Sequence, residues 1–365
     1  MSGVIGGYPG HHSSNPFILP QLMEATKNCV ENFCQVKKGE RVLVVSEYDT
    51  DPIVASAFAA SAQLAGGDVA VIIIPPLSVG GWVKNRPNDM LVAAFEKSDV
   101  VIACTYFEFA HNERTFFSKI FSGKSRVCSV LMASTPGSLI AAGRFPLPLY
   151  CEIGERALKI MKGANRIRYT AASGTDITFE GPQGISYGRP LQPGEWAIFP
   201  PMGINFYPVT SNGVLVPDET ALTGRLSSPI KFTVENNFVT KVEGASGAER
   251  NAVEAFCNGK YYVRHTVIGL NPKVRTVNAP EYERERAAGT TYLGIDGTGP
   301  SGQIDRLKPG FSHLDMIFDT PTVFIDNEMI VKDRRLLLLD DPGLIEFAKQ
   351  YGDPKKVLAQ TSFLW

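Results

Sequence analysis

Short runs rich in Val and Ile alternate with helix-like segments through the first 165 or so residues, and this alternation limits the fold most strongly. The runs are RVLVVSE (41–47), DVAVIIIP (68–75), DVVIACT (99–105) and RVCSVLMA (126–133). Each is short and apolar, which predicts a strand buried on both faces. Strands that alternate with helices indicate a parallel sheet covered on both sides. We therefore predict an N-terminal α/β domain with a parallel sheet over residues 1–165.

The segments between these runs carry helix signals. Residues 51–67 begin with an Asp-Pro pair, which suits a helix N-terminus, and stop at Gly-Gly. Residues 88–98 and 112–123 have the same character, and a helix over roughly 19–36 is expected to pack on the sheet layer.

From about residue 166 the pattern changes to β-rich runs separated by turn signals such as Ser-Asn-Gly and Glu-Asn-Asn. One helix is expected over 247–259, and a closing helix within 340–360. We predict a second, mainly β (α+β) domain over 166–365, and we expect it to be the metal-binding catalytic domain.

Composition and charge limit the partners. The formal net charge is −1, from 36 basic and 37 acidic residues, so neither a nucleic acid nor an anionic membrane is expected to bind. The six cysteines are scattered without a CxxC pair, which favours reduced thiols in a cytoplasmic protein. The first residues lack a signal-peptide pattern, and the apolar runs fall far short of the ~20 residues that cross a bilayer.

Only five histidines occur in the sequence, and one of them lies two residues from a carboxylate. His313 and Asp315 lie in the apolar run SHLDMIF. In a strand, residues i and i+2 project to the same face, so both side chains can contact one metal ion. The pair alone leaves two interpretations open: a metal site, or a His hydrogen-bonded to a carboxylate in an ordinary strand.

A third residue changes this balance. His265 lies within the strand-like run YYVRHTVIGL of the same domain. Two His and one carboxylate form the facial triad that binds Fe(II) and leaves positions open for O₂ and substrate, whereas a zinc site more often is rich in Cys or His. Ligand type alone does not exclude Mn(II). The second ring nitrogen of each His needs an acceptor, and the candidates are EYERER (281–286) and Asp296.

His111 is the remaining candidate outside the His-Gly-Ser-rich terminus. It follows the third predicted strand, and ligands of open α/β sheets collect beyond the carboxyl ends of the strands. His111 is therefore a candidate general base, since an imidazole titrates near neutral pH. The alternative is a residue at a helix N-terminus with no catalytic role.

Several segments of the second half resemble the thermophilic leucyl-aminopeptidase-type metallopeptidases. They are SGTDITFEG, PPMGINFYPVTSNGVLVPD, HTVIGLNPKV, AAGTTYLGIDG and FSHLDMIFDTPTVFIDNEMIVKDRR. The departures matter: the peptidases carry a Glu where this chain has Ile204, another where it has His265, and a His near Tyr292. Because a two-metal peptidase site needs several carboxylates, these departures argue against peptidase activity.

The chain resembles more closely a related family, the 2,5-dihydroxypyridine 5,6-dioxygenases, which open a pyridine ring with O₂ at a non-heme Fe(II). The family's ligands map onto His265, His313 and Asp315, and a base His falls close to His111. One departure is Ile198, where a pocket His can occur in the family. The resemblance implies a small aromatic substrate, O₂ as co-substrate and a homo-oligomer.

On this basis we expect an Fe(II)-dependent, extradiol-like dioxygenase. In it, Tyr292 would donate a hydrogen bond to oxygen, and Phe206 and Ile204 would form an apolar wall that excludes water. Two alternatives stay open: a metallo-aminopeptidase with a reduced, mononuclear site, and a non-catalytic relative on the same fold.

Overall fold

The computed structural model describes residues 16–48, 50–76, 88–105, 124–131, 136–221, 223–244, 247–256, 260–276, 279, 281–298 and 313–361. The chain forms two compact units. The first unit comprises Tyr8–Pro148 and Gly188–Pro201, and the second comprises Leu149–Tyr187 and Met202–Trp365, with the first seven residues grouped with it.

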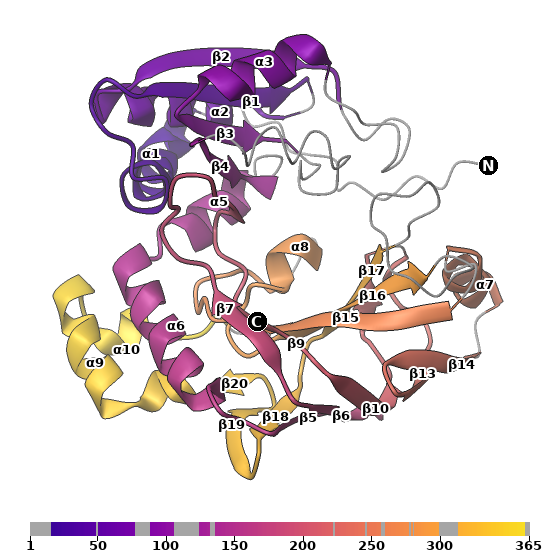
Figure 1. Cartoon of the computed structure of the whole chain (residues 1–365). Coiled ribbons are helices and arrows are strands. Elements are labelled where there is room, and N and C mark those ends of the chain that lie inside the picture. The colour runs from indigo at the N-terminus through magenta and orange to yellow at the C-terminus, as the bar shows by residue number, and fades with distance from the viewer. Residues whose placement is uncertain are drawn as a thin grey trace. The chain divides into compact units, whose positions relative to one another are not determined.

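The first unit is built on a parallel sheet with strand order β2-β1-β3-β4-β8 (Figure 1). Its strands are β1 (Arg41–Glu47), β2 (Asp68–Ile74), β3 (Val100–Cys104), β4 (Arg126–Ser129) and β8 (Trp196–Ile198). The central strands β1, β3 and β4 are buried almost throughout, as their unbroken apolar sequences predict. The predicted parallel α/β layer is confirmed.

Helices accompany this sheet, and the chain signals their ends. They are η1 (Pro16–Ile18), α1 (Leu19–Lys27), the π-helix η2 (Asn28–Phe33), α2 (Pro52–Leu64), α3 (Asp89–Lys97) and α5 (Pro136–Gly143). The side chain of Asp51 caps α2 by accepting a bond from the backbone N–H of Ile53 at 3.0 Å. Leu91 and Phe95 of α3 pack on Leu43 and other residues of the sheet.

Some details differ from the predictions. Strand β2 is not buried on both faces, because it is the edge of the sheet, and Val71 and Ile73 are 47% and 60% exposed. The opening helix changes from α to π geometry at Asn28. The helix expected over 112–123 lies outside the described residues.

The second unit contains a large, antiparallel sheet. Its path runs β12-β11-β17-β16-β15-β14-β13-β10-β6-β5-β18-β19-β20, with β7 paired to β9 and β9 paired to β15. The strands are β5 (Arg166–Thr170), β6 (Asp176–Glu180), β7 (Gln183–Tyr187), β9 (Ile204–Tyr207), β10 (Thr210–Leu215), β11 (Glu219–Thr220), β12 (Gly224–Arg225), β13 (Ile230–Glu235), β14 (Phe238–Gly244), β15 (Lys260–Ile268), β16 (Thr291–Thr298), β17 (His313–Phe318), β18 (Thr322–Ile325), β19 (Glu328–Lys332) and β20 (Arg335–Leu336). The predicted mainly β second half is thus confirmed as a fold class.

The helices described in and next to this unit are few and mostly short. They are α6 (Leu147–Met161), α7 (Gly247–Phe256), α8 (Glu281–Arg284), η5 (Leu337–Asp340), α9 (Pro342–Ala348), η6 (Lys349–Tyr351) and α10 (Pro354–Val357). The expected closing helix is broken into short pieces, because Gly352 adopts a φ of 135° before the new start at Pro354. Among the described residues, no helix combines the length and apolar character needed to cross a membrane.

The boundaries of the two units differ from the predicted division at 165/166 in two places. The first unit ends at Pro148, and Gly188–Pro201 returns to it because β8 pairs with β4. The division into an N-terminal domain over 1–165 and a metal-binding catalytic domain over 166–365 stays a prediction.

Candidate metal centre

Three neighbouring antiparallel strands, β15, β16 and β17, bring the predicted ligands together (Figure 1). His265 lies opposite Gly294, and Gly294 lies opposite Asp315, so these residues form one row across the sheet. Two positions further along β16, in the next row on the same face, Asp296 lies opposite His313. Because side chains alternate along a strand, both rows project from the same face of the sheet.

A β-bulge in β15 puts His265 in this row. Val263 lies opposite Ile295 and His265 lies opposite Gly294, so Arg264 is an extra residue between two neighbouring pairs. With unbroken alternation, Arg264 would lie opposite Gly294 and His265 would point to the other face. The bulge therefore directs the imidazole toward Asp315 and His313.

The three candidate ligands are close enough to hold one metal ion. One donor atom from each of His265, His313 and Asp315 lies within 4.8 Å of the others. Nε2 of His313 is 3.1 Å from Oδ1 of Asp315, and the two imidazole rings stack with centroids 5.4 Å apart and planes 7° apart. The structure thus brings together the three residues proposed from the sequence. The separation of 48 residues between His265 and His313 did not by itself predict that they would be close in space.

Asp296 is the acceptor that orients His313. Its Oδ1 lies 2.6 Å from Nδ1 of His313, and its carboxylate is fully buried. Nδ1 then carries the proton of the bond and Nε2 faces Asp315, which is the arrangement found behind metal-binding imidazoles. Two of the other predicted acceptors pair with arginines: Glu283 with Arg275 at 2.9 Å, and Glu285 with Arg286 at 2.5 Å.

The electrostatics of His313 follow from these carboxylates. Burial by itself lowers the pKa of His313, but the charges and hydrogen bonds of Asp315 and Asp296 outweigh it and raise the pKa to about 10. Two acidic groups therefore stabilise positive charge at this point. A metal ion that binds Nε2 would take the place of the proton, since ligand imidazoles are neutral.

Gly294 makes room for the two imidazoles. A Cβ atom at this position would lie 2.4 Å from Cε1 of His265 and 2.7 Å from Cε1 of His313. Both distances are shorter than real Cβ contacts, so no other residue fits without moving the rings. The role of Gly294 was not predicted, because a glycine inside a strand sequence does not reveal what packs against it.

Two tyrosines flank His265. The ring of Tyr292 meets the imidazole edge-on at 5.7 Å and 85°, and its hydroxyl lies 3.8 Å from Sδ of Met202. The ring of Tyr207 lies 6.3 Å away, and the guanidinium carbon of Arg264 is 5.4 Å from the centre of that ring. Tyr292 was proposed from the sequence, whereas Tyr207 was not.

The predicted apolar wall is wrong. Phe206 lies opposite Thr266, and Ile204 lies opposite Ile268, so both side chains project from the face opposite His265. Phe206 packs in a buried aromatic group with Tyr169 and Phe179. The apolar residues on the ligand face are instead Val267, Tyr292 and Ile317, which form the adjacent row and pack against Met202.

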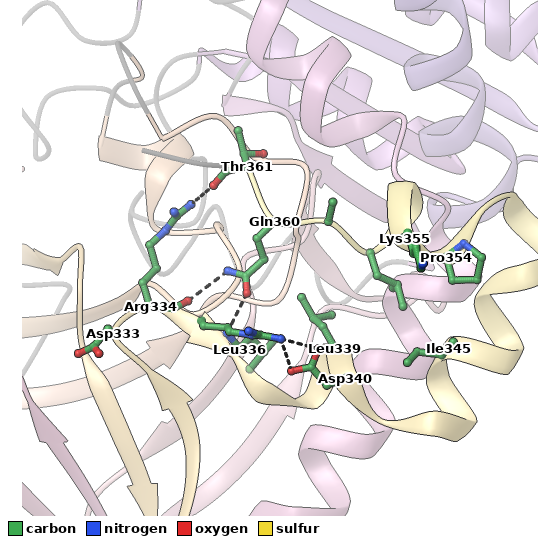
Figure 2. Close-up of a pocket in the computed structure, with 13 residues that line it drawn as sticks. Asp333, Arg334, Leu336, Leu339, Asp340, Ile345, Pro354, Lys355, Gln360 and Thr361 are labelled. Atoms are coloured by element: carbon green, nitrogen blue, oxygen red, sulfur yellow. Dashed lines mark hydrogen bonds and ion pairs between the residues drawn. The ribbon is translucent and has the colours of Figure 1, made fainter. Parts of the chain in front are cut away.

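His111 lies outside the described residues, so its role as a general base stays a prediction. A cavity of about 520 Å³ occurs elsewhere, among residues 333–361, and shares no residue with the metal cluster. Hydrogen bonds join residues that line it: Gln360 accepts from the backbone N–H of Leu336 and donates to the carbonyl of Arg334 (Figure 2), and Arg335 pairs with Asp340.

Comparison with known proteins decides the family. The family model of 2,5-dihydroxypyridine 5,6-dioxygenase matches residues 21–338. The chain belongs to the 2,5-dihydroxypyridine 5,6-dioxygenase family. No curated protein matches the sequence at a significant level.

Two solved structures agree with this assignment in fold. The 2,5-dihydroxypyridine dioxygenase from Pseudomonas putida KT2440 is 18% identical, with a TM-score of 0.67 over 87% of this chain and 97% of that chain. AmpT from Thermus thermophilus, an aminopeptidase, is 12% identical, with a TM-score of 0.54 over 84% of this chain and 95% of that chain. Both the family resemblance and the fold relation to the aminopeptidases are confirmed.

Proposed function

We propose that this member of the family is a non-heme Fe(II) dioxygenase that opens the ring of a hydroxylated pyridine such as 2,5-dihydroxypyridine. The observation that carries the proposal is the convergence of His265, His313 and Asp315 donors within 4.8 Å on one sheet face. Two imidazoles and one carboxylate are the facial-triad donor set for Fe(II).

The donor set fits an Fe(II) ion in two further respects. The Asp296 carboxylate holds Nδ1 of His313 at 2.6 Å, which leaves Nε2 toward Asp315. Gly294 leaves the space between the two imidazoles free of a side chain. Bound iron would supply open positions at which O₂ and the ring hydroxyl are brought together.

The chain's own residues have separate tasks in this proposal. Asp296 fixes the orientation of His313, and the rings of Tyr292 and Tyr207 limit the rotation of His265. Val267 and Ile317 present apolar surface beside the ligands and exclude water. We further propose that His111 takes the proton of the ring hydroxyl and that the Tyr292 hydroxyl donates to oxygen. A homo-oligomer in the cytoplasm is proposed from the family alone.

An anaerobic titration tests the proposal. Metal-depleted protein receives Fe(II) and then 2,5-dihydroxypyridine, and O₂ is added last. We expect one iron per chain, O₂ uptake and loss of the substrate's ultraviolet band. Iron binding without O₂ uptake across a panel of dihydroxypyridines and catechols would contradict the proposed reaction.

Variants separate the proposal from its alternatives. His265→Ala should lose the iron, whereas Glu346→Gln, which changes an exposed carboxylate outside the proposed ligand set, should retain it. Release of an amino acid from a peptide amide with Zn(II) or Co(II) would favour the metallo-aminopeptidase. Protein that binds no metal at this site would favour a non-catalytic relative.

A further inference from the structure

The first unit contains a second group of metal-type donors, and this group consists of thiols only. The sulfur atoms of Cys29, Cys34 and Cys128 lie within 4.8 Å of one another, and all three side chains are fully buried. Sγ of Cys29 is 3.8 Å from Sγ of Cys34 and 3.7 Å from Sγ of Cys128. The proposed dioxygenase reaction uses none of them.

A change in helix geometry creates the first of these contacts. Cys29 lies in the π-helix η2 and Cys34 follows it directly, and the backbone N–H of Cys34 donates to the carbonyl of Cys29 at 2.7 Å. Residues five apart in an α-helix are separated by about 140° around the axis, because each residue turns about 100°. A π-turn brings such residues nearly above one another, and π-turns occur frequently at functional sites.

The sheet supplies the third thiol. Cys128 is in β4, and its Cα partner on the neighbouring strand β3 is Ile102. Cys104 lies two residues beyond Ile102, so it is on the same face and is also buried. The cluster thus lies where η2 contacts β4 of the parallel sheet.

The sulfur separations suit a metal ion. Zinc binds thiolates at about 2.3 Å, and in a tetrahedral arrangement two such sulfurs are about 3.8 Å apart. Two of the three sulfur separations, 3.7 and 3.8 Å, are equal or close to this edge length. Thiolates are soft ligands, and they select Cu(I) and Zn(II) over the harder ions that carboxylates prefer.

A positive charge lies next to the cluster. Nη1 of Arg126, two residues before Cys128, donates at 2.9 Å to the carbonyl of Gln35, the residue that follows Cys34. This buried guanidinium also pairs with Glu40 at 2.5 Å. Because Glu40 already compensates much of this charge, Arg126 offsets only a small part of the excess negative charge that three thiolates around one cation would carry.

We propose that Cys29, Cys34 and Cys128 bind one thiophilic d¹⁰ cation, Zn(II) or Cu(I), at a site separate from the iron centre. Among the described residues no fourth donor lies within the same distance. Three sulfurs suffice for Cu(I), whereas Zn(II) would draw on the Cys104 thiol on the same sheet face. The cation would fasten η2 to β4 and stabilise the first unit, as structural thiolate sites do.

The first measurement is metal content. Protein purified under reducing, anaerobic conditions is analysed for zinc, copper and iron per chain, and zinc or copper identifies the cation. A second sample is unfolded with chelator and refolded with Cd(II), which gives an ultraviolet sulfur-to-metal charge-transfer band only with thiolate ligands. We expect one thiolate-bound equivalent per chain.

Variants assign the band to the cluster. Cys128→Ala preserves an apolar core residue and should lose this one equivalent, whereas Cys151→Ala, outside the cluster, should retain it. His265→Ala should also retain it, which separates this site from the iron centre. If Cys128→Ala does not refold, a charge-transfer band of equal size in His265→Ala and in the unaltered protein still shows a thiolate site that does not depend on the iron centre.

Three results would overturn the proposal. The first is a single bound metal that His265→Ala removes, with no charge-transfer band in the unaltered protein. The second is a disulfide within the cluster, detected as fewer than the six thiols of the sequence in denatured, unreduced protein. The third is retention of the band in Cys128→Ala.

Discussion

Asp296 and His313 lie directly opposite each other on β16 and β17, and the carboxylate accepts a 2.6 Å hydrogen bond from Nδ1 of the imidazole. The bond fixes which ring nitrogen is left for a metal. The Asp296 carboxylate is fully buried, so water cannot replace the bond. A substitution at Asp296 therefore measures the effect of this bond on metal binding and leaves the three proposed ligands unchanged.

Asp296→Asn tests this positioning role. The amide oxygen can still accept the bond, but the negative charge is lost, so we expect iron affinity to fall about 10- to 100-fold. Competition with a coloured chelator measures the affinity. Asp340→Asn, which changes an exposed carboxylate paired with Arg335, should leave it unchanged. Equal affinity in both variants would show that the Asp296 charge does not act on the metal.

Gly294→Ala tests the space between the imidazoles. The added Cβ would lie 2.4 Å from His265 and 2.7 Å from His313, so the rings must separate. We expect a folded protein with iron affinity reduced by at least about tenfold, since ligand geometry is what the contact disturbs. Gly247→Ala, where a Cβ meets nothing within 4 Å, is the control. Full iron content with unchanged affinity would contradict the geometry.

Phe206 and Tyr207 are neighbours with opposite expected effects. Phe206→Ala empties a buried aromatic group and should lower the free energy of unfolding by about 3–5 kcal/mol, with iron content per folded chain retained. Tyr207→Ala changes a side chain that is 40% exposed and should cost about 1 kcal/mol or less. Because its ring flanks His265, Tyr207→Ala should instead weaken iron binding several-fold. Denaturant unfolding and chelator competition distinguish the two; a reversed pattern would contradict the assignment of faces.

Tyr292→Phe separates the hydroxyl from the ring. The ring that meets His265 edge-on is preserved, so iron content should not change. If the hydroxyl donates to oxygen during the reaction, kcat should fall about tenfold, the equivalent of a hydrogen bond worth about 1.4 kcal/mol. Steady-state O₂ uptake with 2,5-dihydroxypyridine measures it. An unchanged kcat would restrict Tyr292 to packing.

The sequence predicted the features that depend on local pattern. The strand over 41–47 has the predicted bounds, because its apolar run is bounded by clear turn signals. The i, i+2 spacing of His313 and Asp315 placed both on one face, and Asp296 was among the nominated acceptors. Residue type and strand context also selected His265, which cross-strand pairing then brings beside them.

The missed features depend on pairing between distant segments. The exposure of Val71 and Ile73 follows from the position of β2 at the sheet edge, which an apolar run does not encode. The face on which Phe206 lies depends on its partner Thr266, sixty residues away in sequence. The space at Gly294 exists only because two imidazoles from other strands approach it.

The bulge at Arg264 shifts the alternation of side chains along β15 by one residue. Residues before it and residues after it follow two different alternations, and the ligand set depends on the second. Deletion of Arg264 would remove the extra residue and leave His265 opposite Gly294 in a regular ladder, whereas closure of the bulge with Arg264 retained would turn His265 to the other face. The metal centre therefore depends on the position of this bulge in β15 as much as on the three donor residues.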